Sequence, residues 1–326
     1  MRRILVEEFG DPVRVCRLQE TEPDGLGPRT VRVRMIARPI NPSDLIPITG
    51  AYAARLTPPF VPGFEGVGTV VDHGPAVEDF QRGQRVLPLG RTGTWSELVD
   101  AEADWCVPVP DWVAMDLAAQ AYINPATAWC LLTSVLDLAP GEAIVVNACG
   151  SAISKVLLAL AKARDLRFIA LVHGADRSRQ WQAMGADDVI DCDRRTIAAG
   201  LETARRTFAL RAGLDAIGGP QGMALAEALP PEARFVQYGL LSGKPLAADL
   251  AERMNNRIKP EMFWLRSVVH AMPPEERLAL FEAIFAFFRA HPVDLAVEAR
   301  YDLAEIGAAL RHNARRGRSG KVLLEG

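Results

Sequence analysis

The fold class follows from one segment, Ile144-Val-Val-Asn-Ala-Cys-Gly-Ser-Ala-Ile-Ser-Lys155. Its first residues are uniformly apolar, which is typical of a buried parallel strand, and residues 154–164 have the pattern of a helix. A turn between such a strand and helix directs backbone N–H groups and the positive helix end toward a phosphate. The segment therefore predicts a dinucleotide-binding turn of a Rossmann fold.

The glycine content of this turn is low. Of the usual Gly-x-Gly-x-x-Gly pattern only Gly150 is present, and Ala152 and Ser154 follow it. Glycines let a pyrophosphate approach the backbone closely, and alanine and serine are small enough to be tolerated. We predict phosphate contacts from Gly150, Ser151, Ala152 and Ile153. The alternative is an ordinary strand–helix turn that binds nothing.

Strands and helices alternate on both sides of the turn. The apolar patterns predict strands at residues 143–147, 168–172, 188–190, 214–217 and 235–238, and helices at 154–164, 177–184 and 222–229. A long apolar helix is expected at 116–136, a further helix at 275–290 and a last strand at 321–324. Repeated β-α-β units with apolar strands indicate a parallel sheet that is covered on both faces.

The N-terminal third has a different character. Short strands are expected at residues 3–8, 30–36, 66–72, 85–89 and 96–100, and six prolines between residues 39 and 62 predict a loop. We therefore expect a catalytic domain at residues 1–112, a cofactor-binding domain at 113–268 and a C-terminal return to the first domain at 269–326.

Composition excludes several classes of protein. The chain has 326 residues, a net charge of −3, 49% hydrophobic and 24% charged residues, as in average soluble proteins. This balance gives no electrostatic reason to bind nucleic acid or an anionic membrane. The five cysteines form no CxxC pair, and neither a signal peptide nor a membrane-spanning run is visible. We expect a cytoplasmic location.

The end of the second predicted strand bears on cofactor choice. An NAD-binding chain usually has an acidic residue there, whereas Val172 is followed here by His173 and, slightly later, Arg177 and Arg179. These three side chains could surround a 2′-phosphate, which favours NADPH over NADH. In the alternative interpretation, Asp176 caps the next helix and both arginines are solvated.

Several short motifs, in order along nearly the whole chain, resemble one family. They are Ile40-Asn-Pro-Ser-Asp44, Thr49-Gly-Ala-Tyr52, Pro62-Gly-Phe-Glu-Gly-Val-Gly68, Gly93-Thr-Trp95, Asn124-Pro-Ala-Thr-Ala128, Leu214-Asp-Ala-Ile-Gly-Gly219, Phe263-Trp-Leu265 and Ser319-Gly-Lys321. The chain resembles the zinc-independent medium-chain dehydrogenase/reductase superfamily, most closely its 2-enoyl thioester reductases, with quinone oxidoreductases as near relatives. The resemblance implies an α/β protein with a GroES-like β-barrel domain and a Rossmann domain, and a homodimer.

The resemblance also implies that no metal is bound. Zinc-dependent relatives have a histidine ligand where this chain has Phe64, which has no lone pair to donate. The cysteine ligand of the first domain is also missing, because Asn41-Pro-Ser-Asp44 stands there.

Site residues follow from the same resemblance. Tyr52 would donate a proton to the substrate or only pack against the nicotinamide, and Asn41 would bond near the nicotinamide ribose or hold Tyr52. Tyr52, Phe64 and Trp95 would line the substrate pocket. The remaining cofactor contacts would come from Thr127, Tyr238, Gly239, Phe263, Trp264 and Lys321.

The expected reaction is NADPH-dependent reduction of the activated C=C of a 2-enoyl thioester, with hydride added to the β carbon and a proton to the α carbon. One alternative is a quinone or enone oxidoreductase of the same fold. A second is a non-catalytic member that binds a cofactor or ligand, which the reduced glycine content of the turn favours. The sequence does not indicate the acyl chain length or the carrier.

Overall fold

The computed structural model describes residues 1–51, 56–90, 93–253, 257–258, 260–315 and 317–326. The chain divides into two compact units: unit 1 comprises Met1–Ala126 and Arg266–Gly326, and unit 2 comprises Thr127–Leu265. The predicted domain limits after residues 112 and 268 stay predictions, because units that separate by compactness need not end where domains do.

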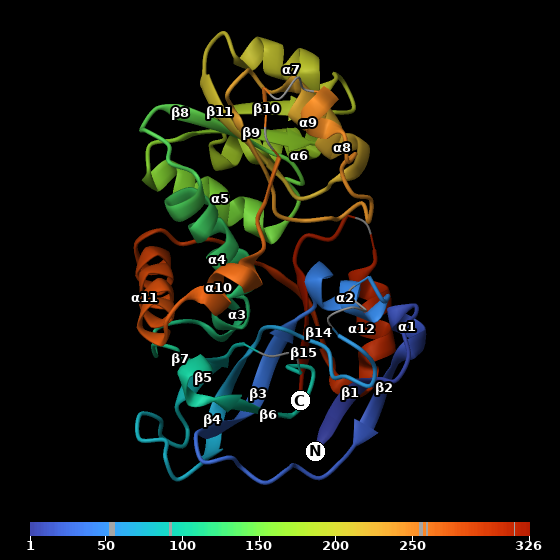
Figure 1. Cartoon of the computed structure of the whole chain (residues 1–326), viewed down its shortest axis with the longest axis vertical. Coiled ribbons are helices and arrows are strands. Elements are labelled where there is room, and N and C mark those ends of the chain that lie inside the picture. Colours follow the sequence, from blue (N-terminus) through green and yellow to red (C-terminus); the bar gives the residue numbers. More distant parts are fainter. Residues whose placement is uncertain (52–55, 91–92, 254–256, 259, 316) are drawn as a thin grey trace. The chain divides into compact units, whose positions relative to one another are not determined.

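Unit 2 is built on a six-stranded parallel sheet with the strand order β10-β9-β8-β11-β12-β13. The strands are β8 (Glu142–Val146), β9 (Arg167–Val172), β10 (Asp188–Asp191), β11 (Ala209–Asp215), β12 (Arg234–Gln237) and β13 (Pro260–Met262). The helices between them are α5 (Ala152–Ala163), α6 (Ala175–Met184), α7 (Ile197–Ala204), α8 (Gly219–Ala228) and α9 (Leu250–Arg253). This order is that of a doubly wound sheet, so the predicted Rossmann fold is confirmed (Figure 1).

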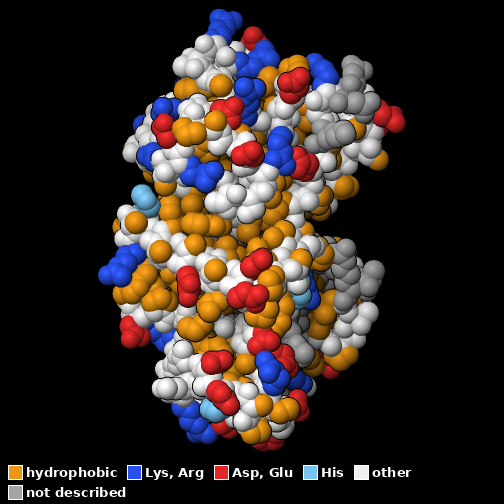
Figure 2. Space-filling model, turned by 60° about the vertical axis from the view of Figure 1, so that its left-hand side comes forward, with side chains coloured by type: hydrophobic (Ala, Val, Ile, Leu, Met, Phe, Trp, Pro, Cys, Tyr) orange, Lys and Arg blue, Asp and Glu red, His pale blue; other side chains and the backbone are white. Residues whose placement is uncertain are grey.

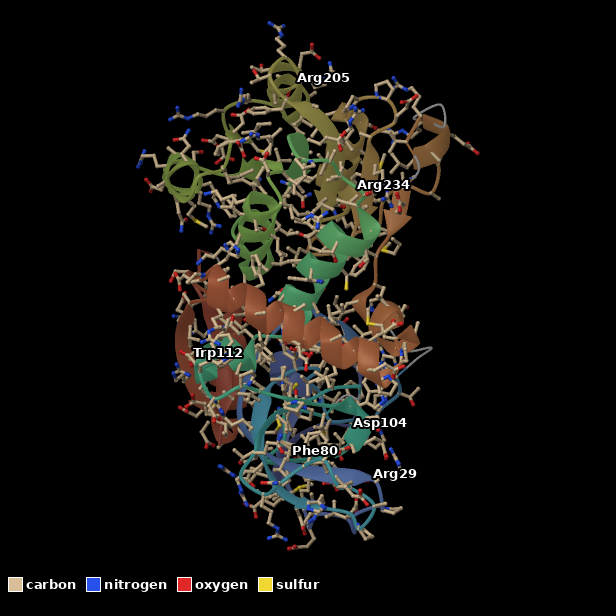
Figure 3. The ribbon with its side chains drawn as sticks, turned by 90° about the vertical axis from the view of Figure 1, so that its left-hand side faces the viewer. Arg29, Phe80, Asp104, Trp112, Arg205 and Arg234 are labelled. Atoms are coloured by element: carbon tan, nitrogen blue, oxygen red, sulfur yellow. The ribbon has the colours of Figure 1, made fainter. Side chains whose placement is uncertain are left out.

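The strands are apolar because both faces of the sheet are covered. On one face, Val145, Ile169 and Phe235 are fully buried in one cluster with Leu201 of α7 and Leu225 of α8. At the edge of the sheet, β13 was not predicted, since three residues are too few for a pattern. Arg234 of β12, labelled in Figure 3, donates from Nε to Glu261 Oε1 of β13 at 2.8 Å.

Unit 1 contains a mostly antiparallel sheet with the order β14-β15-β3-β4-β5-β7, in which β6 also pairs with β3. Its strands are β3 (Thr30–Pro39), β4 (Val67–His73), β5 (Arg85–Pro88), β6 (Leu98–Glu102), β7 (Cys106–Pro108), β14 (Val297–Asp302) and β15 (Lys321–Glu325), and β1 (Arg2–Val6) pairs separately with β2 (Cys16–Glu20). The last strand, β15, lies between β14 and the early strand β3 (Figure 1). Residues 321–325, near the end of the sequence, thus pair with strands of unit 1.

Helices and short helical turns complete the chain. They are α1 (Pro12–Val15), α2 (Pro42–Ile48), α3 (Met115–Ala119), α4 (Ile123–Cys130), α10 (Leu265–Ala271), α11 (Pro274–Ala290), α12 (Ile306–Asn313), the 3₁₀ turns η1 (Ala103–Trp105) and η3 (Leu303–Glu305), and the π-helical turn η2 (Leu131–Val135).

Two predictions about these helices were wrong. The single helix expected at 116–136 is interrupted between α3 and α4, and α4 restarts with Pro125 in its first turn, where the missing N–H costs no hydrogen bond. The proline-rich segment is not all loop, because α2 forms within it. Pro42 takes the first helical position, and Asp44 accepts the Asn41 N–H at 2.7 Å.

Acidic and basic side chains are mixed on the face drawn in Figure 2, and neither sign fills a large area of it. This agrees with the near-neutral net charge of the chain. Within the described residues, no helix is both long and apolar enough to cross a membrane.

Candidate functional site

The turn after β8 is held by its own hydrogen bonds. Ala148 adopts a positive φ of 52°, and its carbonyl oxygen accepts N–H groups from Gly150 at 2.7 Å and Ser151 at 3.0 Å, together with the Ser154 hydroxyl at 3.2 Å. Helix α5 follows at once, with Ser151 as its N-cap. The small side chains at 151 and 154 thus close the turn, with their hydroxyls 3.0 Å apart.

The guanidinium of Arg177 lies directly on this turn. A Cβ atom added to Gly150 would lie only 1.7 Å from Arg177 Nη1, so the guanidinium occupies the space beside this glycine. Arg177 is half-buried, and no carboxylate among the described residues pairs with it. A cation and the N-terminus of a 12-residue helix therefore meet at one turn, which suits an anionic group.

The other two predicted basic residues have protein partners. Arg179 pairs with Asp176 on the exposed face of α6. His173 approaches Asp193 Oδ1 at 2.7 Å through Nδ1 and Gln221 Nε2 at 3.1 Å through Nε2. Arg177 is thus the one member of this predicted trio that lies on the Gly150 turn.

A polar pair that the sequence analysis missed fixes the neighbouring strand ends. Asn147 Nδ2 donates to Asp215 Oδ1 at 2.6 Å, and Asn147 Oδ1 accepts the Ala216 N–H at 2.8 Å. Asp215 also accepts the Gly218 N–H at 3.0 Å. Both residues are buried polar groups next to apolar strands, and that position could have revealed them.

The remaining predicted cofactor residues of unit 2 fall into two groups. Tyr238 and Gly239 follow β12 and Phe263 and Trp264 follow β13, all at the carboxyl edge of the parallel sheet, where ligands of this fold bind. Burial raises the pKa of the Tyr238 phenol. Thr127 lies elsewhere, within α4, and is buried.

Unit 1 contains a cluster of polar side chains, here called the carboxylate cluster: Asn41, Asp44, Glu65 and Lys321. Lys321 Nζ donates to Asn41 Oδ1, and Asn41 Nδ2 donates to Glu65 Oε1 at 2.9 Å. Asn41, Asp44 and Glu65 are each only 1% exposed, whereas Lys321 keeps some exposed surface. Asn41 therefore bridges an ammonium and a carboxylate, with both ends of its amide occupied.

Backbone groups complete the carboxylate cluster. Asp44 accepts N–H groups from Asn41 at 2.7 Å and from Phe64 at 3.0 Å, and Glu65 Oε2 accepts the N–H of Ile123, the first residue of α4, at 2.5 Å. Burial raises the pKa of Asp44 to about 7 and also raises that of Glu65. The same burial lowers the pKa of Lys321. The cluster thus contains two acids and one base that burial pushes toward their neutral forms.

The structure describes two of the three predicted substrate-pocket residues of unit 1. Tyr52 lies outside the described residues. Phe64 is half-buried, and its N–H is bound by Asp44. Trp95 has no exposed surface and belongs to a hydrophobic core with Ile40 and Phe60. The structure therefore places Trp95 in the core of unit 1, and its place in the substrate pocket stays a prediction.

Replacing Asp44 with asparagine should change how stability depends on pH. A carboxyl with a raised native pKa holds a proton that the unfolded chain releases, so its contribution to stability falls as pH rises from about 4 to about 7. Asparagine does not titrate. We expect the unfolding free energy of Asp44→Asn, relative to wild type, to rise across this interval by up to about 1.4 kcal/mol per pH unit.

Urea unfolding between pH 4 and 8 measures this slope. Glu78→Gln, which removes an exposed carboxyl, is the control. A slope for Asp44→Asn no larger than that of the control would contradict the raised pKa.

Two parts of the chain match families of known proteins. Residues 27–111 match the alcohol dehydrogenase GroES-like domain, and residues 184–324 match the zinc-binding dehydrogenase family. The mitochondrial enoyl-[acyl-carrier-protein] reductase of Arabidopsis thaliana is 31% identical over 271 residues, which cover 82% of this chain and 72% of that protein. The chain belongs to the medium-chain dehydrogenase/reductase superfamily. It is therefore an enzyme of the oxidoreductase class, and the predicted fold is confirmed.

Two solved structures share the fold of this medium-chain oxidoreductase over its whole length. A Bacillus thuringiensis protein described as a candidate NADPH:quinone reductase is 36% identical, with a TM-score of 0.94 and 98% of that chain covered. A mycobacterial protein solved in complex with NADPH is 25% identical, with a TM-score of 0.88 and 100% of that chain covered. The similar proteins thus include both enoyl reductases and quinone reductases.

Proposed function

We propose that this medium-chain oxidoreductase reduces the activated C=C of a 2-enoyl thioester with NADPH. The observation that carries the proposal is the 31% identity to an enoyl-[acyl-carrier-protein] reductase over four fifths of the chain. The motifs Gly93-Thr-Trp95 and Asn124-Pro-Ala-Thr127, which resemble those of enoyl thioester reductases, support it.

The turn after β8 fits the phosphates of NADPH. Arg177 lies there without a carboxylate partner among the described residues, beside the N-terminus of α5. The turn from Gly150 to Ile153 and the Arg177 guanidinium would hold the phosphates. When bound, NADPH supplies the hydride for the β carbon.

The α carbon needs a proton, which a residue of the chain can deliver. We assign this role to Tyr52, because a phenol with an ordinary pKa near 10 is protonated at neutral pH and can donate. Asn41 holds Lys321 and Glu65 in place through its amide, and its bond near the nicotinamide ribose stays a prediction. Lys321 keeps exposed surface and stays our candidate for a cofactor contact.

Reduction of a quinone is the second candidate, which the 36% identity to the Bacillus thuringiensis protein favours. NADPH oxidation measured with crotonyl- to dodecenoyl-thioesters, quinones and enones separates the two. We expect the highest kcat/KM with a 2-enoyl thioester. A higher value with a quinone and none with any thioester would assign the second function.

Cofactor affinity should depend on Arg177 and not on Arg179. Because a hydrogen bond to a charged group contributes about 1.5–3 kcal/mol, Arg177→Ala should weaken NADPH binding by about 10- to 100-fold. Arg179→Ala is the matched control, since this arginine on the same helix pairs with Asp176. Tryptophan fluorescence quenching gives the dissociation constants. Equal losses in both variants would remove Arg177 from the site.

The reaction should need no metal. Phe64 stands where zinc-dependent relatives have a histidine ligand, and the described residues contain no group of three or more metal-ligating side chains. Activity should survive exhaustive chelation, and elemental analysis should find well under one zinc per chain. Stoichiometric zinc that is lost together with activity would overturn this prediction. A homodimer and a cytoplasmic location stay predictions.

A further inference from the structure

The segment that carries Lys321 is a tight turn bound to strand β14. Lys321 N–H donates to the Ala296 carbonyl at 2.9 Å, and a Cβ atom on Gly320 would lie 2.6 Å from that same oxygen. The Arg318 guanidinium donates to the Gly320 carbonyl at 3.0 Å. The direction in which the Lys321 side chain leaves β15 is therefore set by how this turn is held.

One carboxylate, that of Glu298, binds most of the turn. Glu298 Oε2 accepts the N–H of Ser319 at 2.6 Å, the hydroxyl of Ser319 at 3.2 Å and the N–H of Gly320 at 3.3 Å. The hydrogen bond from His312, followed by these bonds from Ser319 and Gly320, lowers the pKa of Glu298 to about 2. The carboxylate is thus ionised at neutral pH and accepts three hydrogen bonds from two consecutive residues.

The other oxygen of this carboxylate is fixed from the opposite side. His312 Nε2 of α12 lies 2.9 Å from Glu298 Oε1, and the Tyr301 hydroxyl lies 2.9 Å from His312 Nδ1. An imidazole that accepts a hydrogen bond from the Tyr301 hydroxyl at Nδ1 and donates one to Glu298 from Nε2 satisfies both contacts. The His312 and Glu298 side chains are only 15% and 24% exposed, so water competes little for these bonds.

We propose that Glu298 is a positioning residue for Lys321. Held by His312 and Tyr301, its carboxylate binds the Ser319–Gly320 turn and so directs the Lys321 ammonium to Asn41 in the carboxylate cluster. Hydrogen bonds lead from Tyr301 through His312 and Glu298 to Ser319. The backbone continues from Ser319 to Lys321, whose ammonium is bound to the buried amide of Asn41. In the proposed reductase, this network fixes a lysine that we expect at the cofactor, a consequence that rests on the proposed function.

Acylation of Lys321 tests the proposal without any assay of activity. The protein is treated briefly with an N-hydroxysuccinimide acetate, and modification of each lysine is read by mass spectrometry. In wild type, Lys321 should react slowly relative to the exposed Lys244, because its amino group is bound to Asn41 and is less accessible to the reagent. Glu298→Ala should raise the rate at Lys321 by at least about tenfold and leave Lys244 unchanged.

Two variants separate positioning from general loosening of the fold. Glu298→Gln keeps an acceptor for Ser319 and should keep Lys321 protected. Glu305→Ala removes another glutamate of the same region, one that accepts the Asp302 N–H, and should behave as wild type. If Glu298→Ala does not fold, Glu298→Asp takes its place, since its shorter side chain cannot reach both His312 and the turn.

A Lys321 rate in folded Glu298→Ala or Glu298→Asp that equals the wild-type rate would overturn the proposal. So would an equal rise at Lys321 and at all other buried sites. In NADPH-dependent turnover, Glu298→Ala should lower kcat/KM and Glu298→Gln should restore most of it. Absence of any turnover in wild type would count against the proposed function alone, because the acylation result does not depend on it.

Discussion

Replacing Lys321 with methionine is expected to lower the unfolding free energy by about 3 kcal/mol at pH 8. Methionine has a similar length and creates no large cavity, so the main loss is the cation that faces Asp44 and Glu65. Removing one partner from a buried charge cluster typically costs about 3–5 kcal/mol. We take the lower end because Lys321 keeps some exposed surface, where water screens its charge.

The loss should be smaller at pH 5 than at pH 8. Without the cation, the pKa values of the two buried carboxyls, already raised in wild type, should rise further. Their protonated forms are tolerated in the native state at low pH, and the penalty develops as pH rises. Chemical unfolding at both pH values measures the effect, with the exposed Lys244→Met as control. A Lys321→Met protein as stable as wild type at pH 8 would rule out the charge cluster.

Replacing Tyr52 with phenylalanine should lower kcat for a 2-enoyl thioester by about 10²–10⁴-fold. General acid catalysis typically contributes a factor of this size, and the substitution removes only the hydroxyl. A water molecule that replaces the hydroxyl would place the loss at the low end. NADPH affinity should change little, because the aromatic ring is retained.

Steady-state kinetics and fluorescence titration together test the assignment. Trp112→Phe is the control, because it changes an exposed aromatic side chain beside Arg289 that has no proposed role in the reaction. A kcat for Tyr52→Phe within about threefold of wild type would show that Tyr52 is a packing residue. The quinone candidate would then gain, since a phenolate product can take its proton from solvent.

The parallel sheet of unit 2 was predictable because its strands are buried on both faces, so that Val145 and Ile169 lie in unbroken apolar runs. Helix α2 was missed because proline density was taken to mean loop, although Pro42 at the first position and Asp44 three residues after Asn41 form a helix start. The sequence thus contained a helix-start signal at residues 41–44, but the high proline content of the segment led to the prediction of a loop.

The carboxylate cluster could be predicted only in part. Asn41 and Lys321 were identified through the resemblance, but Asp44 and Glu65 were not identified as site residues, since charged residues are usually exposed. Nothing local shows that Glu65 faces Asn41, which is 24 residues away, or that Lys321 reaches it from 280 residues away. Likewise, the sequence does not indicate that the Arg177 guanidinium lies next to Gly150. That contact depends on how α6 is placed relative to the turn after β8.

The position of β15 between β14 and β3 has a consequence for the order of events during synthesis. Unit 2 is continuous in sequence, so all its strands have been synthesised before the last 61 residues of unit 1 are made. Until then, residues 37–39 of β3 lack the strand with which they pair. Asp44 and Glu65 also lack the ammonium of Lys321. An unpaired strand edge is a site of wrong association. The nascent chain must therefore carry this open edge until residues 323–325 are added.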